Sequence, residues 1–398
     1  MSTSRIINRA HDKSALYTGA EPPRLLGSAS RWVALAIGVA VVAAFFSIAN
    51  EDWLTIANYT LIAAIAALAL NVLSGYTGQV SLGIAFFMAI GAYTAAWLGG
   101  DPPTTARDPI GLGLPVFIWL PTAGITAALA GALIGPTALR LKGFYLGIVS
   151  LALVFIGHYL FTNVSGLTGG PQGRNFPVPA IGGLSFADQN DIFGVALTSG
   201  QQYFLLILVV LGLSALFVTN VMRSRAGRAF QAVRDNELGA AIMGVNLFEA
   251  KMGAFILSSF LAGIAGALFA SYSRYVVPNY WDLTLSIQFV AAIIVGGIAS
   301  VWGSILGAAF VFALPRMIDQ FSLLPQHTSG APGLESGDLN AVIYGLLIVV
   351  FLLFEPGGLI GLVRRKQLLT RLFKTHGEEG GEPAEITDLP ASGPNGPR

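Results

Sequence analysis

The chain has 398 residues, of which 54% are hydrophobic and 11% are charged, and its formal net charge is +1. Soluble domains carry about 25% charged residues, so this composition excludes an ordinary soluble protein and favours one that crosses a bilayer several times. The chain has no cysteine, which excludes disulfides and thiolate metal sites.

Ten segments are apolar enough to be membrane-spanning helices, each of which needs about 20 residues. The first follows a charged region of about thirty residues, which is too long for the start of a signal peptide, so we interpret it as a retained span. The eighth and ninth are separated only by "ASVWGS", and either could be re-entrant, which gives eight to ten spans. The predicted spans are 32–49, 54–74, 80–99, 115–135, 143–163, 202–220, 252–271, 286–300, 303–320 and 340–362.

The 22 basic residues divide unevenly between the two sides of this layout. Eighteen fall on the side that holds both termini, and the other four are Arg107, Arg174, Arg274 and Arg316. Basic residues accumulate in cytoplasmic loops. The sequence therefore predicts an all-α integral membrane protein with glycine-broken segments and with both termini in the cytoplasm.

The same layout divides the chain into three parts. Residues 1–31 form a cytoplasmic N-terminal segment, residues 32–362 a transmembrane domain, and residues 363–398 a tail that is first basic and then rich in Gly, Pro and acidic residues. The end of the tail is too polar to bury a core, and we expect it to be disordered. Within the transmembrane domain, 164–201 is the longest external loop and 221–251 the longest internal one.

Residues 70–96, "LNVLSGYTGQVSLGIAFFMAIGAYTAA", place glycines and small polar groups at the mouth of an apolar span. Non-helical backbone is tolerated at membrane depth only where it lines a cavity or is buried in protein. Transporters use such breaks to present backbone groups to a substrate. A tight cytoplasmic turn before a small-residue helix contact explains the pattern equally well. The candidate path residues here are Asn71, Gly75, Gly78, Gln79, Ser81 and Gly83.

Other polar side chains fall inside predicted spans and are further candidates for a translocation path. No series of intramembrane acidic residues accompanies them, which argues against a proton relay. No P-loop, metalloprotease or serine-hydrolase motif occurs, so the chain is not expected to bind ATP or to act as an enzyme. The further path candidates are Tyr93, Tyr145, Ser150 and Gln288.

The internal loop 221–251 contains a predicted helix over 227–244, with Phe230, Val233 and Ala241 on its apolar stripe. Gly244 follows the last apolar turn as a helix stop. The loop is either a solvated basic loop that sets topology or a short helix that docks on a partner.

Within this loop, "ELGAAIMG" (237–244) is similar to the Glu-Ala-Ala…Gly signature of the coupling loop in ABC importer permeases. The longer stretch 224–270 resembles the larger of the two permease types in branched-chain amino acid ABC importers. Further stretches match that family in the same order, and the resemblance covers about 55–362. These stretches are "LNVLSGYTGQVSLGIAFFMAIGAYTAA", "LRLKGFYLGIVSLAL", "LTGGPQG", "VGGIASVWGSILGAAF" and "IYGLLIVVFLLFEPGGL".

The resemblance implies a permease subunit of the bacterial inner membrane that works by alternating access. It implies a second related permease, two ATP-binding subunits that use ATP and Mg²⁺, and a periplasmic substrate-binding protein; no cofactor is expected on this chain. The implied substrates are branched-chain amino acids or a related small solute, and relatives carry urea, short amides or aromatic acids. The residues predicted for ATPase coupling are the four that match the motif, Glu237, Ala240, Ala241 and Gly244, and two arginines of the same loop that would supply polar contacts, Arg228 and Arg234.

A secondary transporter or channel that works alone is the alternative reading. The absent acidic relay and the coupling-like loop count against it. A membrane-embedded assembly or sensor protein is a third class, and the glycine-broken spans count against that class. Co-purification with an ATPase separates the first reading from the other two.

Overall fold

The computed structural model describes most of the region between residues 49 and 320. The predicted spans at 32–49 and 340–362, the segment 1–31 and the tail 363–398 lie outside the described residues, apart from a few positions. Contacts between Cα atoms divide the chain into residues 1–54 and 55–398, and the second unit is described below. The described residues are 45–46, 49–100, 111–138, 144–176, 178–181, 184–186, 190–192, 195–320, 345–346, 349 and 358–361.

Most of the described residues are helical. Five helices in the described part are long and apolar enough to cross a membrane, and they coincide with five predicted spans. The long helices are α3 (Glu51–Leu70, continued by the π-helix η1, Asn71–Gly75), α5 (Val116–Ala138), α6 (Phe144–Asn163), α8 (Ser199–Arg223) and α11 (Leu247–Ser273). The shorter ones are α4 (Ile84–Gly99), α7 (Ser165–Thr168), η2 (Gly170–Gln172), α9 (Arg225–Asp235), α10 (Glu237–Ile242), η3 (Pro278–Tyr280), α12 (Leu283–Gly296), α13 (Val301–Ala308), η4 (Ala309–Ala313) and α14 (Leu314–Gln320).

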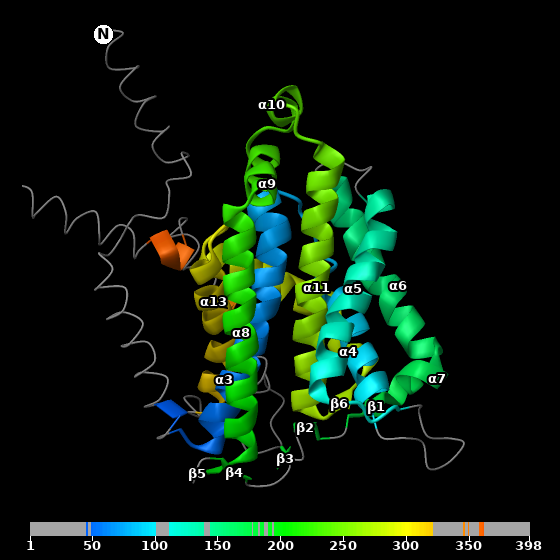
Figure 1. Cartoon of the computed structure of the whole chain (residues 1–398), viewed down its shortest axis with the longest axis vertical. Coiled ribbons are helices and arrows are strands. Elements are labelled where there is room, and N and C mark those ends of the chain that lie inside the picture. The colour runs from blue at the N-terminus through cyan, green and yellow to red at the C-terminus, as the bar shows by residue number, and fades with distance from the viewer. Residues whose placement is uncertain are drawn as a thin grey trace, which may run out of the picture. The chain divides into compact units, whose positions relative to one another are not determined.

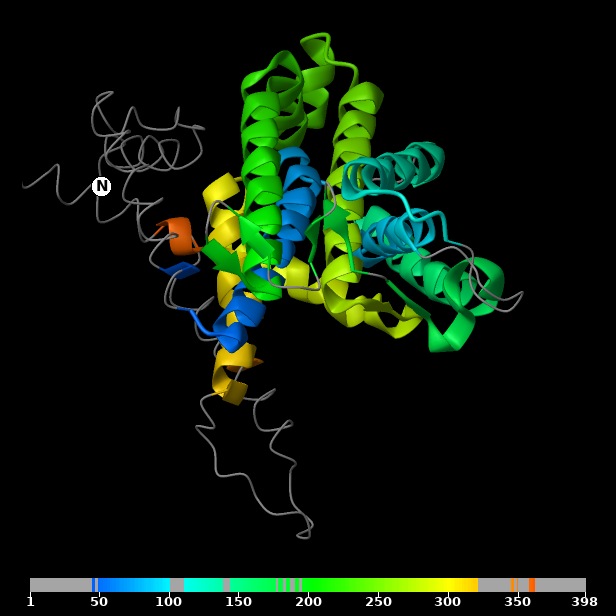
Figure 2. The same ribbon diagram turned by 60° about the horizontal axis from the view of Figure 1, so that its bottom comes forward.

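Helix α11 lies at the centre of the bundle and packs against α4 and α5 (Figure 1). The packing brings backbones together: a Cβ on Gly91 of α4 would lie 2.1 Å from the carbonyl oxygen of Gly263 on α11. Small residues let helix backbones approach closely in lipid, and the resulting van der Waals packing is one of the forces that hold helices together there. On the other side of α11 lies α3, between α11 and α8 (Figure 2).

Six short strands among the described residues modify the all-α prediction. They lie in the loops opposite α10 (Figure 1), where pairing satisfies backbone groups that no helix uses. Three antiparallel pairs form, and the first joins the long external loop to the end of α11. The strands are β1 (Arg174–Asn175) with β6 (Tyr275–Val276), β2 (Ala180–Ile181) with β3 (Leu184–Ser185), and β4 (Asn190–Ile192) with β5 (Val195–Leu197).

Arg174 anchors the loop that is predicted to be external. Its side chain is buried, and its Nη1 donates a hydrogen bond to the carbonyl oxygen of Leu167, 3.0 Å away. Burial lowers the pKa of the guanidinium, and the nearby Tyr93 opposes that shift. The motif at 167–173 is therefore folded around this arginine.

The internal loop differs from the single helix predicted over 227–244. Asn236 adopts an extended conformation, ends α9 and caps α10, because its Oδ1 accepts a hydrogen bond from the Gly239 N–H at 3.0 Å. Phe230 and Val233 are buried as predicted. Ala241 is exposed, and Ala240 takes the buried place, since the break at Asn236 rotates the register.

Helices α12 and α13 pack against each other and form a hairpin. The fourteen residues of α12 span about 21 Å, which is less than the roughly 30 Å of a hydrocarbon core. The short turn at 297–300 includes Ala299 with φ 58°. The predicted span at 286–300 is thus shorter than expected at its C-terminal end.

Candidate functional site

The predicted break near residue 78 is present. Helix α3 continues through the π-helix to Thr77, residues 78–83 belong to no helix or strand, and α4 begins at Ile84. Gly78 has φ +69°, a conformation that residues with a Cβ resist. The chain therefore leaves one helix and enters the next through a non-helical segment.

Asn71 ties this segment to the turn between α12 and α13. Its Oδ1 accepts a hydrogen bond from the backbone N–H of Ala299 at 2.9 Å. Its Nδ2 donates to the carbonyl oxygen of Ser300 at 3.0 Å and to the Oγ of Ser304 at 2.6 Å. The side chain is fully buried, so these three bonds satisfy a polar group that water does not reach.

Gly75 allows this arrangement. A Cβ at position 75 would lie 1.8 Å from the Oδ1 of Asn71 and 2.8 Å from the backbone nitrogen of Ala299. Any side chain there would displace the hydrogen-bonded amide. The two predicted path residues Asn71 and Gly75 thus meet in one structural joint.

The internal loop holds the same segment from the other side. The Nη1 of Arg234 donates to the carbonyl oxygen of Gly75 at 3.1 Å, and the Nε2 of Gln79 donates to the carbonyl oxygen of Lys251 at 3.3 Å. Lys251 in turn forms an ion pair with Glu237 at 2.6 Å between Nζ and Oε1. The loop therefore bonds directly to the broken segment. We call residues 71–83, with Arg234, Lys251 and 299–304, the inner joint.

Ser150 of α6 supports the far end of the broken segment. Its Oγ accepts from the backbone N–H of Leu82 at 2.8 Å and donates to the carbonyl oxygen of Gly147 at 2.8 Å. Ser81 is buried, and its Oγ accepts from the N–H of Gly83 at 3.3 Å. A Cβ on Gly83 would lie 3.1 Å from the carbonyl oxygen of Ser150, so the contact is close.

Several predicted residues lie outside the inner joint. Tyr93 is buried beside Phe161, with ring centroids 4.9 Å apart. Tyr145 and Arg228 are exposed. Gln288 lines a separate recess on α12.

The exposed surface of α10 and the residue after it is apolar, which sequence reasoning missed. Leu238, Ile242 and Met243 are 77%, 86% and 87% exposed. Gly244, with φ +84°, ends the helix as predicted. Their spacing (i, i+4, i+5) is the signal that would have shown a shared face. We call these three exposed side chains, Leu238, Ile242 and Met243, the apolar knob; they lie on a loop that is otherwise polar.

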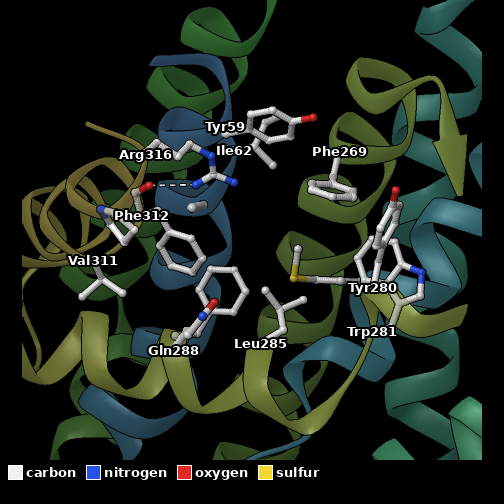
Figure 3. Close-up of a pocket in the computed structure, with 14 residues that line it drawn as sticks. Tyr59, Ile62, Phe269, Tyr280, Trp281, Leu285, Gln288, Val311, Phe312 and Arg316 are labelled. Atoms are coloured by element: carbon white, nitrogen blue, oxygen red, sulfur yellow. Dashed lines mark hydrogen bonds between the residues drawn. The ribbon is translucent and has the colours of Figure 1, made fainter. Parts of the chain in front are cut away.

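A recess of about 400 Å³ lies between α3, α11, α12 and the η4–α14 segment (Figure 3). We call it the outer recess; its residues Tyr59 and Phe269 lie toward the ends of α3 and α11 that are remote from Gly75 and Lys251. Tyr59 precedes Gly75 by sixteen residues, about 24 Å of helix. The residues that line the outer recess are Tyr59, Ile62, Ala63, Met88, Phe269, Tyr280, Trp281, Leu285, Gln288, Phe289, Val311, Phe312, Pro315 and Arg316.

Among the described residues, no group of three His, Asp or Glu side chains is placed to hold a metal ion.

Residues 53–352 match the family described as branched-chain amino acid transport system / permease component. The chain belongs to this family. It is 32% identical over 337 residues to the high-affinity branched-chain amino acid transport system permease protein LivM of Salmonella typhimurium, covering 81% of this chain and 73% of the relative. The LivM protein of Escherichia coli is also 32% identical, over 78% of this chain and 70% of the relative.

A shorter similarity reaches the other permease type. The probable branched-chain amino acid transport permease protein LivH of Methanocaldococcus jannaschii is 30% identical over 43% of this chain and 50% of the relative. No solved structure matches the chain. The chain is therefore a multi-pass permease subunit of an ABC transport system, and it is not an enzyme.

Proposed function

We propose that this permease subunit carries branched-chain amino acids, or closely related small solutes, across the bacterial inner membrane. It would work with a second related permease, two ATP-binding subunits and a periplasmic binding protein. ATP and Mg²⁺ would bind only to the ATP-binding subunits. The names of the two LivM relatives support the substrate class. The observation that carries the mechanism is the direct bonding of the internal loop to the broken segment through Arg234, Gln79 and Lys251.

The apolar knob of Leu238, Ile242 and Met243 is the proposed contact with an ATP-binding subunit. Exposed apolar side chains of this size on a short, capped helix favour a partner groove over water. Helix α9 fixes the knob to the bundle through the buried Phe230 and Val233. A displacement of α10 would then be passed on to the helix bundle through α9.

Alternating access follows from the same bonds. When the ATP-binding subunits close, α9 and α10 move, and Arg234 and Lys251 move with them. The broken segment follows because Gly75 and Gln79 accept and donate the connecting hydrogen bonds. Asn71 passes the motion to the α12–α13 turn. The inner joint thus forms the moving inner gate, in which the predicted path residues take part.

The proposed topology has ten spans, with both termini and α10 in the cytoplasm. The 18-to-4 division of basic residues supports it. A fluorescent reporter that matures only in the cytoplasm, fused after Arg398, should be bright. A dark fusion of normal abundance would show that the span count is wrong by an odd number.

The decisive experiment is reconstitution of the complete importer in proteoliposomes. Leucine uptake should require ATP, the binding protein and this chain. Ile242→Asp should abolish the stimulation of ATP hydrolysis by the loaded binding protein, because a carboxylate replaces an apolar contact. The matched control Ile242→Leu keeps an apolar side chain at the same exposed position and should retain the stimulation. Solute flux through this chain alone would favour a stand-alone transporter or channel and overturn the proposal.

A further inference from the structure

Helix α8 presents an exposed apolar stripe. Leu205, Val209 and Leu216 are exposed and, at 3.6 residues per turn, lie on one face of the helix. Where helices of this protein approach each other closely, as at Gly91 and Gly263, the residues in contact are small, whereas the stripe consists of branched side chains. Side chains of that kind hold helix backbones apart and pack well against acyl chains. The stripe therefore faces lipid.

The stripe ends in a cation. Arg223 is the last residue of α8 and follows Leu216 by seven residues, so it lies on the same face. The 25 residues of α8 span about 37 Å, which exceeds the roughly 30 Å of a hydrocarbon core. The last turn of α8 thus reaches the headgroup level of the bilayer. There the stem of an arginine lies along acyl chains while its guanidinium remains among the headgroups.

Two further arginines are brought to the same place. The chain turns at Ser224, whose Oγ donates to the carbonyl oxygen of Val221 at 2.7 Å, and α9 begins at Arg225. The side chain of Arg228 reaches back to the end of α8, because its Nη1 donates to the carbonyl oxygen of Arg223 at 3.3 Å. All three arginines are exposed. We call Arg223, Arg225 and Arg228 the basic elbow.

Among the described residues, the basic elbow has no acidic partner. The ion pairs of the internal loop join Arg234 to Asp235 and Lys251 to Glu237, and neither includes an arginine of the elbow. Three guanidinium groups within six positions repel one another, and an anion that they share relieves this repulsion. The planar fork of a guanidinium matches two oxygens of a phosphate. Charge and position therefore favour the phosphate of a lipid.

The basic elbow and the apolar knob lie at different ends of α9. Figure 1 shows α9 between the end of α8 and α10, and α10 begins twelve residues after Arg225. The knob is apolar and suits a groove in a protein. The elbow is cationic and continues a stripe that faces lipid, so the two surfaces suit different partners.

We propose that the basic elbow binds the phosphate of an anionic phospholipid, such as phosphatidylglycerol, whose acyl chains lie along the stripe of α8. The inference goes beyond the proposed function and does not depend on the transported solute. Arg228, which was predicted to take part in ATPase coupling, then contacts lipid. The bound lipid fixes the start of α9 at the bilayer surface, while Arg234 near the other end of α9 bonds to the inner joint.

The test is quenching of a fluorescent label by brominated lipids in the complete importer, reconstituted in phosphatidylcholine nanodiscs. This chain has no native cysteine, so Leu216→Cys carries one label on the stripe beside the elbow, with any cysteines of the other subunits replaced. At equal mole fraction, phosphatidylglycerol brominated in its acyl chains should quench this label about twofold more strongly than brominated phosphatidylcholine, because basic residues enrich the anionic lipid. Leu205→Cys, on the same face eleven residues earlier, is the matched control and should show no preference.

The charge of the elbow is tested by two triple variants. Arg223→Gln, Arg225→Gln and Arg228→Gln, made together, should remove the preference at position 216. The corresponding triple change to Lys should keep most of it, since the charges remain and only the forks are lost. Size-exclusion chromatography reports whether each variant assembles. If the glutamine variant does not assemble, the comparison of the labels at 216 and 205 in the otherwise unchanged chain decides the question.

Equal quenching by the two brominated lipids at position 216 would overturn the inference. So would a preference of the same size at position 205, which would indicate a general enrichment of anionic lipid around the protein, or a preference that survives the glutamine changes. A preference that is present in this chain alone and lost in the complete importer would show that another subunit covers the elbow, and it would overturn the inference as well.

Discussion

The inner joint and the outer recess are built from different kinds of residue. The inner joint consists of glycines, small polar side chains and backbone groups, held by hydrogen bonds between segments more than 150 positions apart in the sequence. The outer recess consists of aromatic and aliphatic side chains around one arginine. Directional hydrogen bonds tie distant segments to one another, whereas apolar side chains pack without a fixed direction. The two regions of the bundle are therefore held in different ways.

Asn71→Leu should have the largest effect, because it removes all three bonds of the joint and leaves buried partners unsatisfied. Each such group costs about 1–3 kcal/mol. We expect leucine uptake to be lost and the apparent Tm of the complex to fall by ~5 °C or more. Asn163→Leu, at an exposed position on α6 where the amide bonds only within its helix, is the control and should leave both unchanged. A stable Asn71→Leu complex with normal uptake would show that the joint transmits nothing.

Gly78→Val should block transport more than it harms folding. The positive φ is strained for a β-branched residue, and the Cβ would lie 3.1 Å from the Cγ of Arg234. A cost of about 1–2 kcal/mol in one state of the gate predicts a roughly tenfold loss of uptake at near-normal abundance. Gly212→Val is the control: Gly212 lies on α8, and a Cβ there meets nothing within 4 Å. Equal uptake by the two variants would contradict a role for Gly78 in the gate.

The ion pair between Glu237 and Lys251 should have a smaller effect, since Glu237 is partly exposed and such pairs contribute up to about 1 kcal/mol. Glu237→Lys and Lys251→Glu should each reduce the coupling of ATP hydrolysis to uptake by ~5-fold. The double variant restores opposite charges and should recover most of the loss. If the loss of coupling in the double variant equals the sum of the losses in the two single variants, the ion pair does not hold α10 to α11.

The sequence was sufficient to predict the features that depend on neighbouring residues. The apolar spans, the break around Gly78 and the stop at Gly244 follow from local composition and glycine chemistry. The partners of Asn71 lie more than 220 positions away, and no local pattern identifies them. Arg316 counted only as an external basic residue, because its place above Tyr59 depends on how α3 and α14 pack.

The register of the internal loop also escaped prediction, for a physical reason. Asn236 is tolerated inside a helix and also favours an N-cap. The structure uses it as a cap, which splits the predicted helix in two and exposes Ile242 and Met243. The spacing of Leu238, Ile242 and Met243 indicates a shared face, but only the cap at Asn236 shows that this face is exposed.

Cysteine labelling should separate the two regions by the signal to which each responds, and it exploits a chain without native cysteine. Val80→Cys and Ser81→Cys lie in the broken segment, one exposed and one buried. Their labelling by a small water-soluble thiol reagent should differ severalfold between nucleotide-free and ATP-trapped complexes, because the joint moves with α9 and α10. Leu285→Cys in the outer recess should instead label alike in both nucleotide states. If the cysteines at 80 and 81 label alike in both nucleotide states, the broken segment is a static turn. If Leu285→Cys responds to nucleotide as strongly as they do, the response is not confined to the inner joint.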